Sequence, residues 1–145
     1  MTSPFGVQKM DLRLARQLST EQSTFSTDHV RHFGFPERFL QLGFGFCALE
    51  VQEIVSVATT CAVCNRGIEI QISTREPCRG RGLAAAVAVN LVVYSLEHNL
   101  DPNWDAANEK SVGLARKLGY TPRATYSMFF YSNESTLCLE GLPYE

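Results

Sequence analysis

The chain has 145 residues, enough for one domain with a substantial apolar core. Its 45% hydrophobic and 19% charged residues are typical of a soluble globular protein and exclude an intrinsically disordered one. The net charge of −2 and the lack of a long basic run argue against nucleic acid as the main partner.

Targeting signals and cysteines indicate the compartment. The N-terminus MTSPFGVQKMDLR has no apolar core of signal-peptide length, and the apolar run Leu83–Leu96 is too short to cross a bilayer. The odd number of cysteines is best explained by free thiols in a reducing compartment. They are Cys47, Cys61, Cys64, Cys78 and Cys138. We therefore expect a cytoplasmic protein with no membrane span.

Cys61 and Cys64 have the spacing of half a zinc site. No second pair follows at a matching spacing, so two buried thiols near a hairpin are the favoured alternative. We expect no metal.

The first 42 residues form a short helical part. Apolar residues at helical spacing predict an amphipathic helix over Lys9–Leu18, followed by a polar loop over Ser19–Asp28. A second helix begins at Pro36 and ends at Gly43. Large apolar side chains there either pack on a sheet, which is favoured, or line a substrate groove. They are Phe33, Phe35, Phe39 and Leu42.

The next segment predicts three antiparallel strands. Gly43–Val51 and Glu53–Val63 are rich in β-branched and aromatic residues, with a tight turn at Gln52–Glu53. Asn65–Gly67 supplies the next turn, into a strand over Ile68–Thr74 where isoleucines alternate with polar residues.

A basic loop with two glycines follows this strand. Thr74–Cys78 reads as a turn, Arg79-Gly80-Arg81-Gly82 as the loop, and Ala84–Leu96 as a buried helix. Glycines let backbone N–H groups face an anion, and the first turn of a helix has unpaired donors and partial positive charge. The loop is thus a candidate phosphate cradle; the alternative is an ordinary surface turn.

A strand and a helix follow the stop at Asn99. The strand begins just after Pro102, and its order after a strand and a helix predicts a parallel crossover. Asn108 caps a helix over Glu109–Leu118, which Gly119 ends.

The C-terminal region reads as a final strand over Ala124–Tyr131 and a tail over Ser132–Glu145, in which Leu137–Leu139 could form one more short strand. These elements predict an α/β (α+β) fold with a mixed central sheet and flanking helices. We expect a single domain over 1–145, with its core at 43–131.

Two motifs and the order of the predicted elements resemble the GNAT acetyltransferases, and the match covers about Gly43 to Tyr131. Arg79-x-x-Gly82-x-Ala84 resembles the family's pyrophosphate-binding motif. The second resembles a subgroup signature, carried here by Trp104-Asp105, Ala107-Asn108, Ser111 and Leu118-Gly119-Tyr120.

This resemblance implies an N-acetyltransferase. A primary amine would attack the thioester of acetyl-CoA directly in a ternary complex, with the coenzyme arm between the separating strands Ile68–Thr74 and Asn103–Ala106. The implied coenzyme contacts are backbone groups of Ile72, Ser73 and Thr74, the charges of Arg79 and Arg81, the amides of Gly80, Arg81, Gly82, Leu83 and Ala84, and the residues Asn108 and Ser111. For Asn108, helix capping is an equally good explanation.

Transfer requires a base for the ammonium and an acid for the thiolate. Glu69, the only carboxylate on the polar face of its strand, is the candidate base or an ordinary solvated carboxylate. Many relatives carry a tyrosine as acid where this chain has Ala115; Tyr120 or Tyr126 could substitute, although Tyr120 also suits aromatic packing. Some family members work without a dedicated acid.

The N-terminal part is short compared with that of many relatives. The acceptor site is therefore open, completed by a second subunit in a homodimer, or absent. The alternatives to the enzyme are a non-catalytic acyl-CoA-binding module and a protein-interaction domain.

Overall fold

A computed structural model of the chain describes residues 6–20, 25, 29–106, 108–121, 126–131 and 136–144. These residues belong to two compact units, 1–102 and 103–145, and each unit is described by itself. The expectation of a single domain, with its parts at 1–42, 43–131 and 132–145, stays a prediction.

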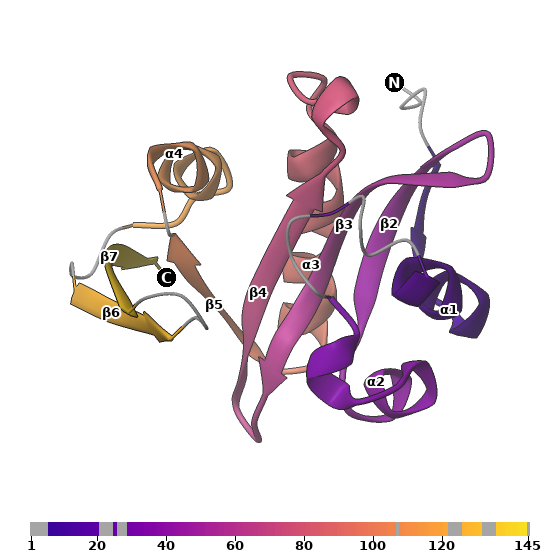
Figure 1. Ribbon diagram of the computed structural model, residues 1–145, viewed down its shortest axis with the longest axis horizontal. Coiled ribbons are helices and arrows are strands. Elements are labelled where there is room, and N and C mark those ends of the chain that lie inside the picture. Colours follow the sequence, from indigo (N-terminus) through magenta and orange to yellow (C-terminus); the bar gives the residue numbers. More distant parts are fainter. Residues whose placement is uncertain are drawn as a thin grey trace. The chain divides into compact units, whose positions relative to one another are not determined.

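The first unit contains a four-stranded antiparallel sheet in the order β1-β2-β3-β4 (Figure 1). Its strands are β1 (Gly6–Lys9), β2 (Gly45–Glu50), β3 (Glu53–Val63) and β4 (Gly67–Thr74). Its helices are α1 (Leu12–Thr20), α2 (Pro36–Leu42) and α3 (Leu83–Glu97), with short 3-10 turns at Arg31–Phe33 and Glu76–Cys78. The predicted three-stranded antiparallel meander is confirmed as β2, β3 and β4.

The predicted helix over Lys9–Leu18 was wrong at its start. Gly6–Lys9 is a strand paired with β2, and α1 begins only at Leu12. The carboxylate of Asp11 sets this start, because its Oδ1 accepts a hydrogen bond of 2.9 Å from the backbone N–H of Leu14.

The turn between β2 and β3 lies one residue earlier than predicted. Val51 and Gln52 have φ of 49° and 65°, and Glu53 already belongs to β3. Two central residues with positive φ form the kind of turn whose twist matches that of a hairpin. The polar pair was a poor guide because backbone twist, and not polarity, selects the turn.

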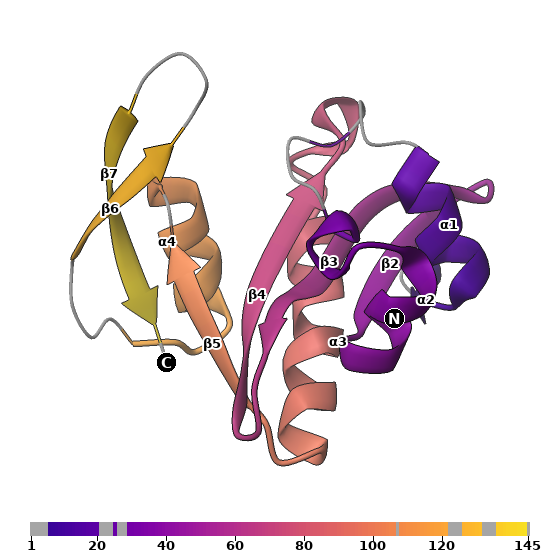
Figure 2. The same cartoon turned by 60° about the horizontal axis from the view of Figure 1, so that its bottom comes forward.

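Helices cover both faces of this sheet, α3 on one and α1 with α2 on the other (Figure 2). Side chains that alternate along each strand supply the two apolar clusters. The α3 side holds Phe44, Phe46, Ala48, Val55, Ala58, Ile68, Leu83, Val87 and Leu91. The α1/α2 side holds Met10, Leu14, Ala15, Leu18, Phe25, Val30, Phe39, Cys47, Ile54 and Val57.

The predicted core packing of the apolar side chains around α2 holds for two of the four, and the predicted substrate groove stays untested. Phe39 is fully buried, and Phe33 packs against the same cluster, as expected for core residues. Phe35 and Leu42, by contrast, are 53% and 51% exposed. The sequence spacing could not separate these two pairs, because Phe33 and Phe35 precede α2 and have no helical periodicity, and α2 itself has only seven residues.

The second unit contains an antiparallel sheet in the order β5-β7-β6 and one helix. These elements are β5 (Asp101–Ala106), α4 (Glu109–Lys117), β6 (Tyr126–Tyr131) and β7 (Thr136–Tyr144). The tail therefore forms a nine-residue strand between β5 and β6, longer than the short strand expected. Pro102 lies inside β5 rather than before it. The predicted crossover joins the two units and stays a prediction.

Candidate functional site

The glycine loop joins the end of β4 to α3, as the sequence predicted. Gly80 and Gly82 have φ of 81° and 79°, and a Cβ added to either would meet nothing within 4 Å. These two positions therefore favour glycine because of their left-handed backbone and not because of crowding. The first turn of α3, beginning at Leu83, follows directly.

α3 starts one residue earlier than predicted, which changes the part that Leu83 can play. The Leu83 side chain lies inside the apolar cluster of the α3 side and is 2% exposed. Only its backbone can face a ligand. Ala84 is half-buried in the first turn beside it.

Both loop arginines lie on the surface, and both have partners. Arg79 Nε donates a hydrogen bond of 3.3 Å to the carbonyl oxygen of Thr74, which closes the loop back onto the end of β4. Arg81 Nη1 lies 3.2 Å from Glu50 Oε2. This pair is exposed, so water screens it and it contributes little to stability. The arrangement holds two cationic groups beside the glycines without burying either.

The carboxyl end of β4 is fastened to β3. Ile72 pairs with Ala58, and Ser73 with Val57. The hydroxyl of Ser56 donates to the carbonyl oxygen of Ser73 at 3.2 Å, and lies 2.8 Å from Thr74 Oγ1. The candidate coenzyme contacts of β4 thus belong to a strand end with a fixed position on β3.

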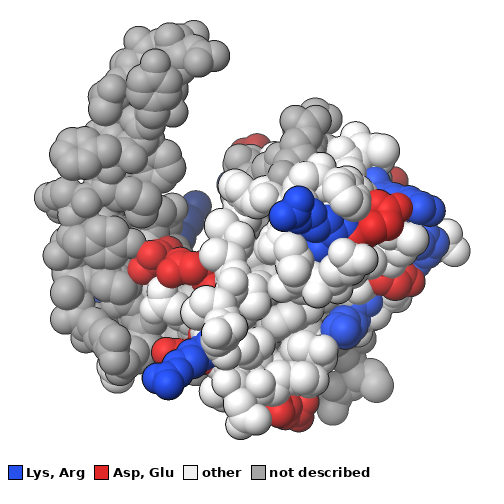
Figure 3. Space-filling view, turned by 90° about the horizontal axis from the view of Figure 1, so that it is seen from below, with Lys and Arg blue, Asp and Glu red and all other residues white. Residues whose placement is uncertain are grey.

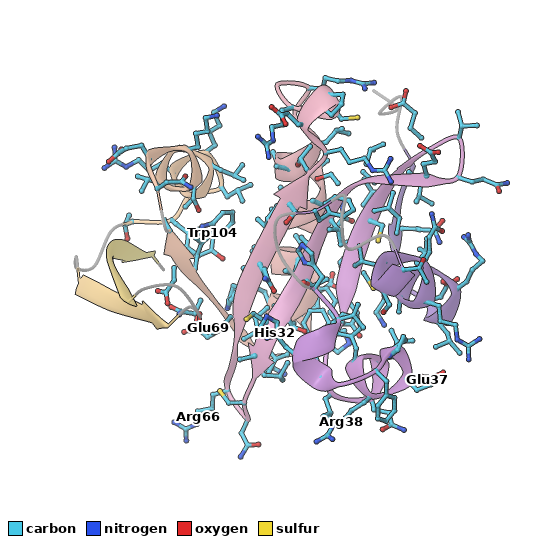
Figure 4. All side chains as sticks on the ribbon, viewed as in Figure 1. His32, Glu37, Arg38, Arg66, Glu69 and Trp104 are labelled. Atoms are coloured by element: carbon cyan, nitrogen blue, oxygen red, sulfur yellow. The ribbon has the colours of Figure 1, made fainter. Side chains whose placement is uncertain are left out.

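Glu69 lies near the opposite end of β4. Figure 4 shows it close to the hairpin that carries Arg66. It is five residues from Thr74, or about 17 Å at roughly 3.3 Å per residue. Its side chain is partly exposed, and it faces β3 near Cys61: burial and then the Glu69 charge raise the pKa of the Cys61 thiol.

A buried polar cluster on the α1/α2 side was missed by sequence reasoning. His29 is 2% exposed; its Nδ1 lies 2.6 Å from Thr59 Oγ1, and its Nε2 lies 2.8 Å from Ser73 Oγ. His29 follows a polar stretch with no readable periodicity. The hydroxyls of Thr59 and Ser73 gave no separate signal, because β3 and β4 each carry other polar residues.

In the second unit, Asn108 has the capping role that the sequence allowed. Its Oδ1 accepts a hydrogen bond of 3.0 Å from the backbone N–H of Ser111. The Ser111 hydroxyl in turn accepts a hydrogen bond of 2.9 Å from Trp104 Nε1. The Tyr120 ring is buried edge-to-face against Trp104, as expected for aromatic packing. The side chain of Tyr126, in β6, lies outside the described residues.

Cys61 and Cys64 are not part of a metal site among the described residues. Cys61 is half-buried in β3, and the exposed Cys64 donates a weak hydrogen bond to the carbonyl oxygen of Gly67 across the hairpin. Among the described residues, no three His, Cys, Asp or Glu side chains are grouped to hold a metal ion. Within the same residues, no helix is long and apolar enough to cross a membrane.

Charged side chains of both signs are interspersed on the face that Figure 3 shows. An ion pair joins α1 to α2, with Arg16 Nη2 2.8 Å from Glu37 Oε1. This pair holds the pKa of the Glu37 carboxyl below its usual value.

A strand, a loop with two left-handed glycines and a helix N-terminus form a geometry in which backbone amides can bind a phosphate group. A family model, described as GNAT acetyltransferase, matches residues 1–129. The chain therefore belongs to the GNAT acetyltransferase family. The finer subgroup signature stays a prediction.

Individual relatives agree with this family. The chain is 28% identical over 121 residues to the uncharacterized N-acetyltransferase YdfB of Bacillus subtilis, covering 81% of this chain and 46% of that one. A GCN5-related N-acetyltransferase-like protein from Streptococcus suis has a TM-score of 0.75 and 29% identity, over 100% of this chain and 52% of that one. The chain thus spans about half the length of these relatives.

The structure of yncA, a putative acetyltransferase from Salmonella typhimurium solved with acetyl-CoA, has a TM-score of 0.74. It is 12% identical and is covered over 93% of its length by 97% of this chain. At this identity the likeness concerns the fold alone. The expected α/β fold class is confirmed.

Proposed function

We propose that the chain binds acetyl-CoA at the glycine loop and transfers the acetyl group to a primary amine by direct attack in a ternary complex. The observation that carries the proposal is the pair of left-handed glycines, Gly80 and Gly82, between β4 and the start of α3. Neither glycine carries a Cβ that could cover its backbone N–H, as the close approach of a pyrophosphate requires, and the first turn of α3 follows directly.

In this proposal, the backbone N–H groups of Gly80 through Ala84 bind the pyrophosphate. Arg79 and Arg81 add positive charge, and Arg81 exchanges its exposed partner Glu50 for the phosphate oxygens. The pantetheine arm pairs with backbone groups of Ile72–Thr74. We retain Asn108 and Ser111 as coenzyme contacts, although capping and the Trp104 contact already explain their geometry.

For the chemistry, we propose Glu69 as the base, acting directly or through water, with Tyr120 or Tyr126 as acid. The buried packing of Tyr120 on Trp104 makes it the weaker of the two tyrosines. Ala115, fully buried in α4, supports the second candidate function, an acyl-CoA-binding module without turnover. The homodimer and the cytoplasmic location stay predictions.

The test is thermal unfolding with and without acetyl-CoA, for the unmodified chain and two variants. At roughly a hundred times its dissociation constant, a ligand of the folded state stabilises by about 2.7 kcal/mol, and the melting temperature rises. Gly82→Asp should abolish this rise, because it places a carboxylate where the pyrophosphate binds. Asparagine has the same shape as aspartate, tolerates the left-handed backbone and is neutral, so Gly82→Asn should lose less of the rise in melting temperature.

Equal loss in the two variants would mean that the charge is not facing a phosphate. No rise for the unmodified chain at millimolar coenzyme would overturn the proposal and favour an interaction domain. A rise without thiol release on any amine would favour the non-catalytic module.

A further inference from the structure

The His29 imidazole connects a segment outside the sheet with two of its strands. Thr59 lies in β3 opposite Gln71, and Ser73 lies in β4 opposite Val57, so the ring spans a diagonal pair of hydroxyls on the α1/α2 side. All three residues are buried, and Ser73 keeps the largest exposure of the three, at 8%. Ser73 is therefore the outer member of the cluster.

The donor and the acceptor of each hydrogen bond in this cluster can exchange roles. A neutral imidazole donates from one nitrogen and accepts at the other, while a hydroxyl can do both. With Nδ1–H donating to Thr59, Nε2 accepts the Ser73 proton, and the ring can take up that proton without movement of a heavy atom. The two contacts, at 2.6 and 2.8 Å, are short enough for transfer.

A second polar group lies beside Ser73 on the same strand. Gln71 is two residues away, so the two side chains point to the same face about 7 Å apart. Gln71 Oε1 is buried and has no hydrogen-bond partner among the described residues. A buried acceptor without a donor is costly, and an amine N–H is a group that would satisfy it.

We propose that Gln71 and Ser73 receive the acceptor amine, and that Ser73 passes a proton from this amine to His29. The inference rests on the proposed function: it keeps the coenzyme site and the acetyl transfer, adds the position of the acceptor, and puts Ser73 and His29 in the roles of base and acid in place of Glu69 and the tyrosines. Ser73 and Gln71 contact the substrate. His29 and Thr59 are positioning residues, because they act through Ser73.

A primary amine that has released its ammonium proton to water forms a bond from nitrogen to the thioester carbon. It gives a second proton to Ser73 Oγ, while the Ser73 hydroxyl proton moves to His29 Nε2. The carbon–sulfur bond breaks, its electron pair leaves with the coenzyme thiolate, and that sulfur takes the proton back from His29 through Ser73. The cluster thus serves as base and then as acid.

The alternative is a purely structural tie, in which the hydrogen bonds of His29 only hold its segment on the sheet. His29→Gln separates the two, because a glutamine amide can accept one hydrogen bond and donate another but cannot take up a proton. The relay predicts a stable variant with lost turnover; the tie predicts a stable variant with normal turnover. Thr60→Val is the matched control for Thr59→Val, since the Thr60 hydroxyl is equally buried but bonds to Phe44.

The experiment measures acetyl-CoA affinity by calorimetry and thiol release with ethanolamine, spermidine, tyramine, lysine amide or water as acceptor. We expect Ser73→Ala and His29→Gln to lower kcat by about 100-fold or more with unchanged coenzyme affinity. Thr59→Val should lower kcat by less, Thr60→Val should leave it unchanged, and Gln71→Leu should raise KM for the amine.

Normal kcat in His29→Gln, or in Ser73→Ala if the former fails to fold, would overturn the relay and leave the proposed function standing. Coenzyme binding by the unmodified chain with no turnover on any of these acceptors would overturn both transfer and relay. Absence of coenzyme binding would overturn the proposed function itself.

Discussion

The two faces of the first unit's sheet differ in chemistry although the same strands build them. On the α3 side, the buried side chains of the cluster are apolar throughout. On the α1/α2 side, an apolar cluster lies next to the hydrogen-bonded group of His29, Thr59 and Ser73. Both faces bury hydroxyl groups, such as that of Ser95 in α3 on the first face, but among the described residues only the second face buries an imidazole, which can take up a proton.

The buried polar groups of the α1/α2 side carry a free-energy cost of burial. Burying a hydroxyl or an imidazole is unfavourable unless each polar atom has a partner, whereas burying a methyl group is favourable without one. Val57 and Thr59 are both fully buried on the α1/α2 side of β3. An aliphatic residue at the second position would leave the buried His29 Nδ1 without its hydroxyl partner, so the threonine is explained by that contact.

The largest expected effect is on the α3 side. Leu91 is fully buried in α3, and Leu91→Ala should lower the free energy of unfolding by about 2–5 kcal/mol through lost transfer energy and a cavity. Val89→Ala, on the same helix but 45% exposed, should change it by about 0.5 kcal/mol or less. Urea denaturation measures both, and equal losses would contradict the assignment of the two helix faces.

The sequence predicted the elements around this helix well, because each had a local signal. Alternation predicted β4, and the two glycines predicted the loop between β4 and α3. Asn108 predicted the start of α4 through a cap formed within four residues. The family motifs added the coenzyme, which local chemistry alone does not specify.

The parts that the sequence did not predict depend on distant contacts. β1 has four residues and is defined by its pairing with β2, about forty residues away in the chain. The contacts of His29 with Thr59 and Ser73 join residues 30 and 44 positions apart. No pattern within a short window carries such contacts, so the cluster on which the proposed relay depends was also the least predictable.

A substitution at Gly45, in β2, would disturb Thr59 on the α1/α2 side of the sheet. A Cβ there would lie 2.8 Å from Thr59 Cγ2 and 2.9 Å from the Ala58 carbonyl oxygen, closer than real Cβ contacts allow. Gly45→Ala should therefore lower the free energy of unfolding by about 1–3 kcal/mol. Gly113→Ala, in the open interior of α4, should instead raise it by about 0.5–1 kcal/mol. Thermal or urea unfolding gives the two signs, and a neutral Gly45→Ala would show that Thr59 can move.

The smallest effect concerns how far water reaches the α1/α2 side, and the rate of thiol labelling at Cys47 measures this access. Cys47 is fully buried there, and burial, with Asp11 adding to it, raises its pKa to about 12. At pH 8 only about one in 10⁴ of its thiols would be ionised, and the thiolate is the form that reacts. Iodoacetamide should thus modify the exposed Cys64 rapidly and Cys47 only after unfolding, as peptide mass spectrometry would show.

Similar labelling rates for Cys64 and Cys47 in the folded chain would mean that water reaches the α1/α2 side freely. In that case the His29 cluster would exchange protons with solvent, and a relay confined to Ser73 would lose its physical basis.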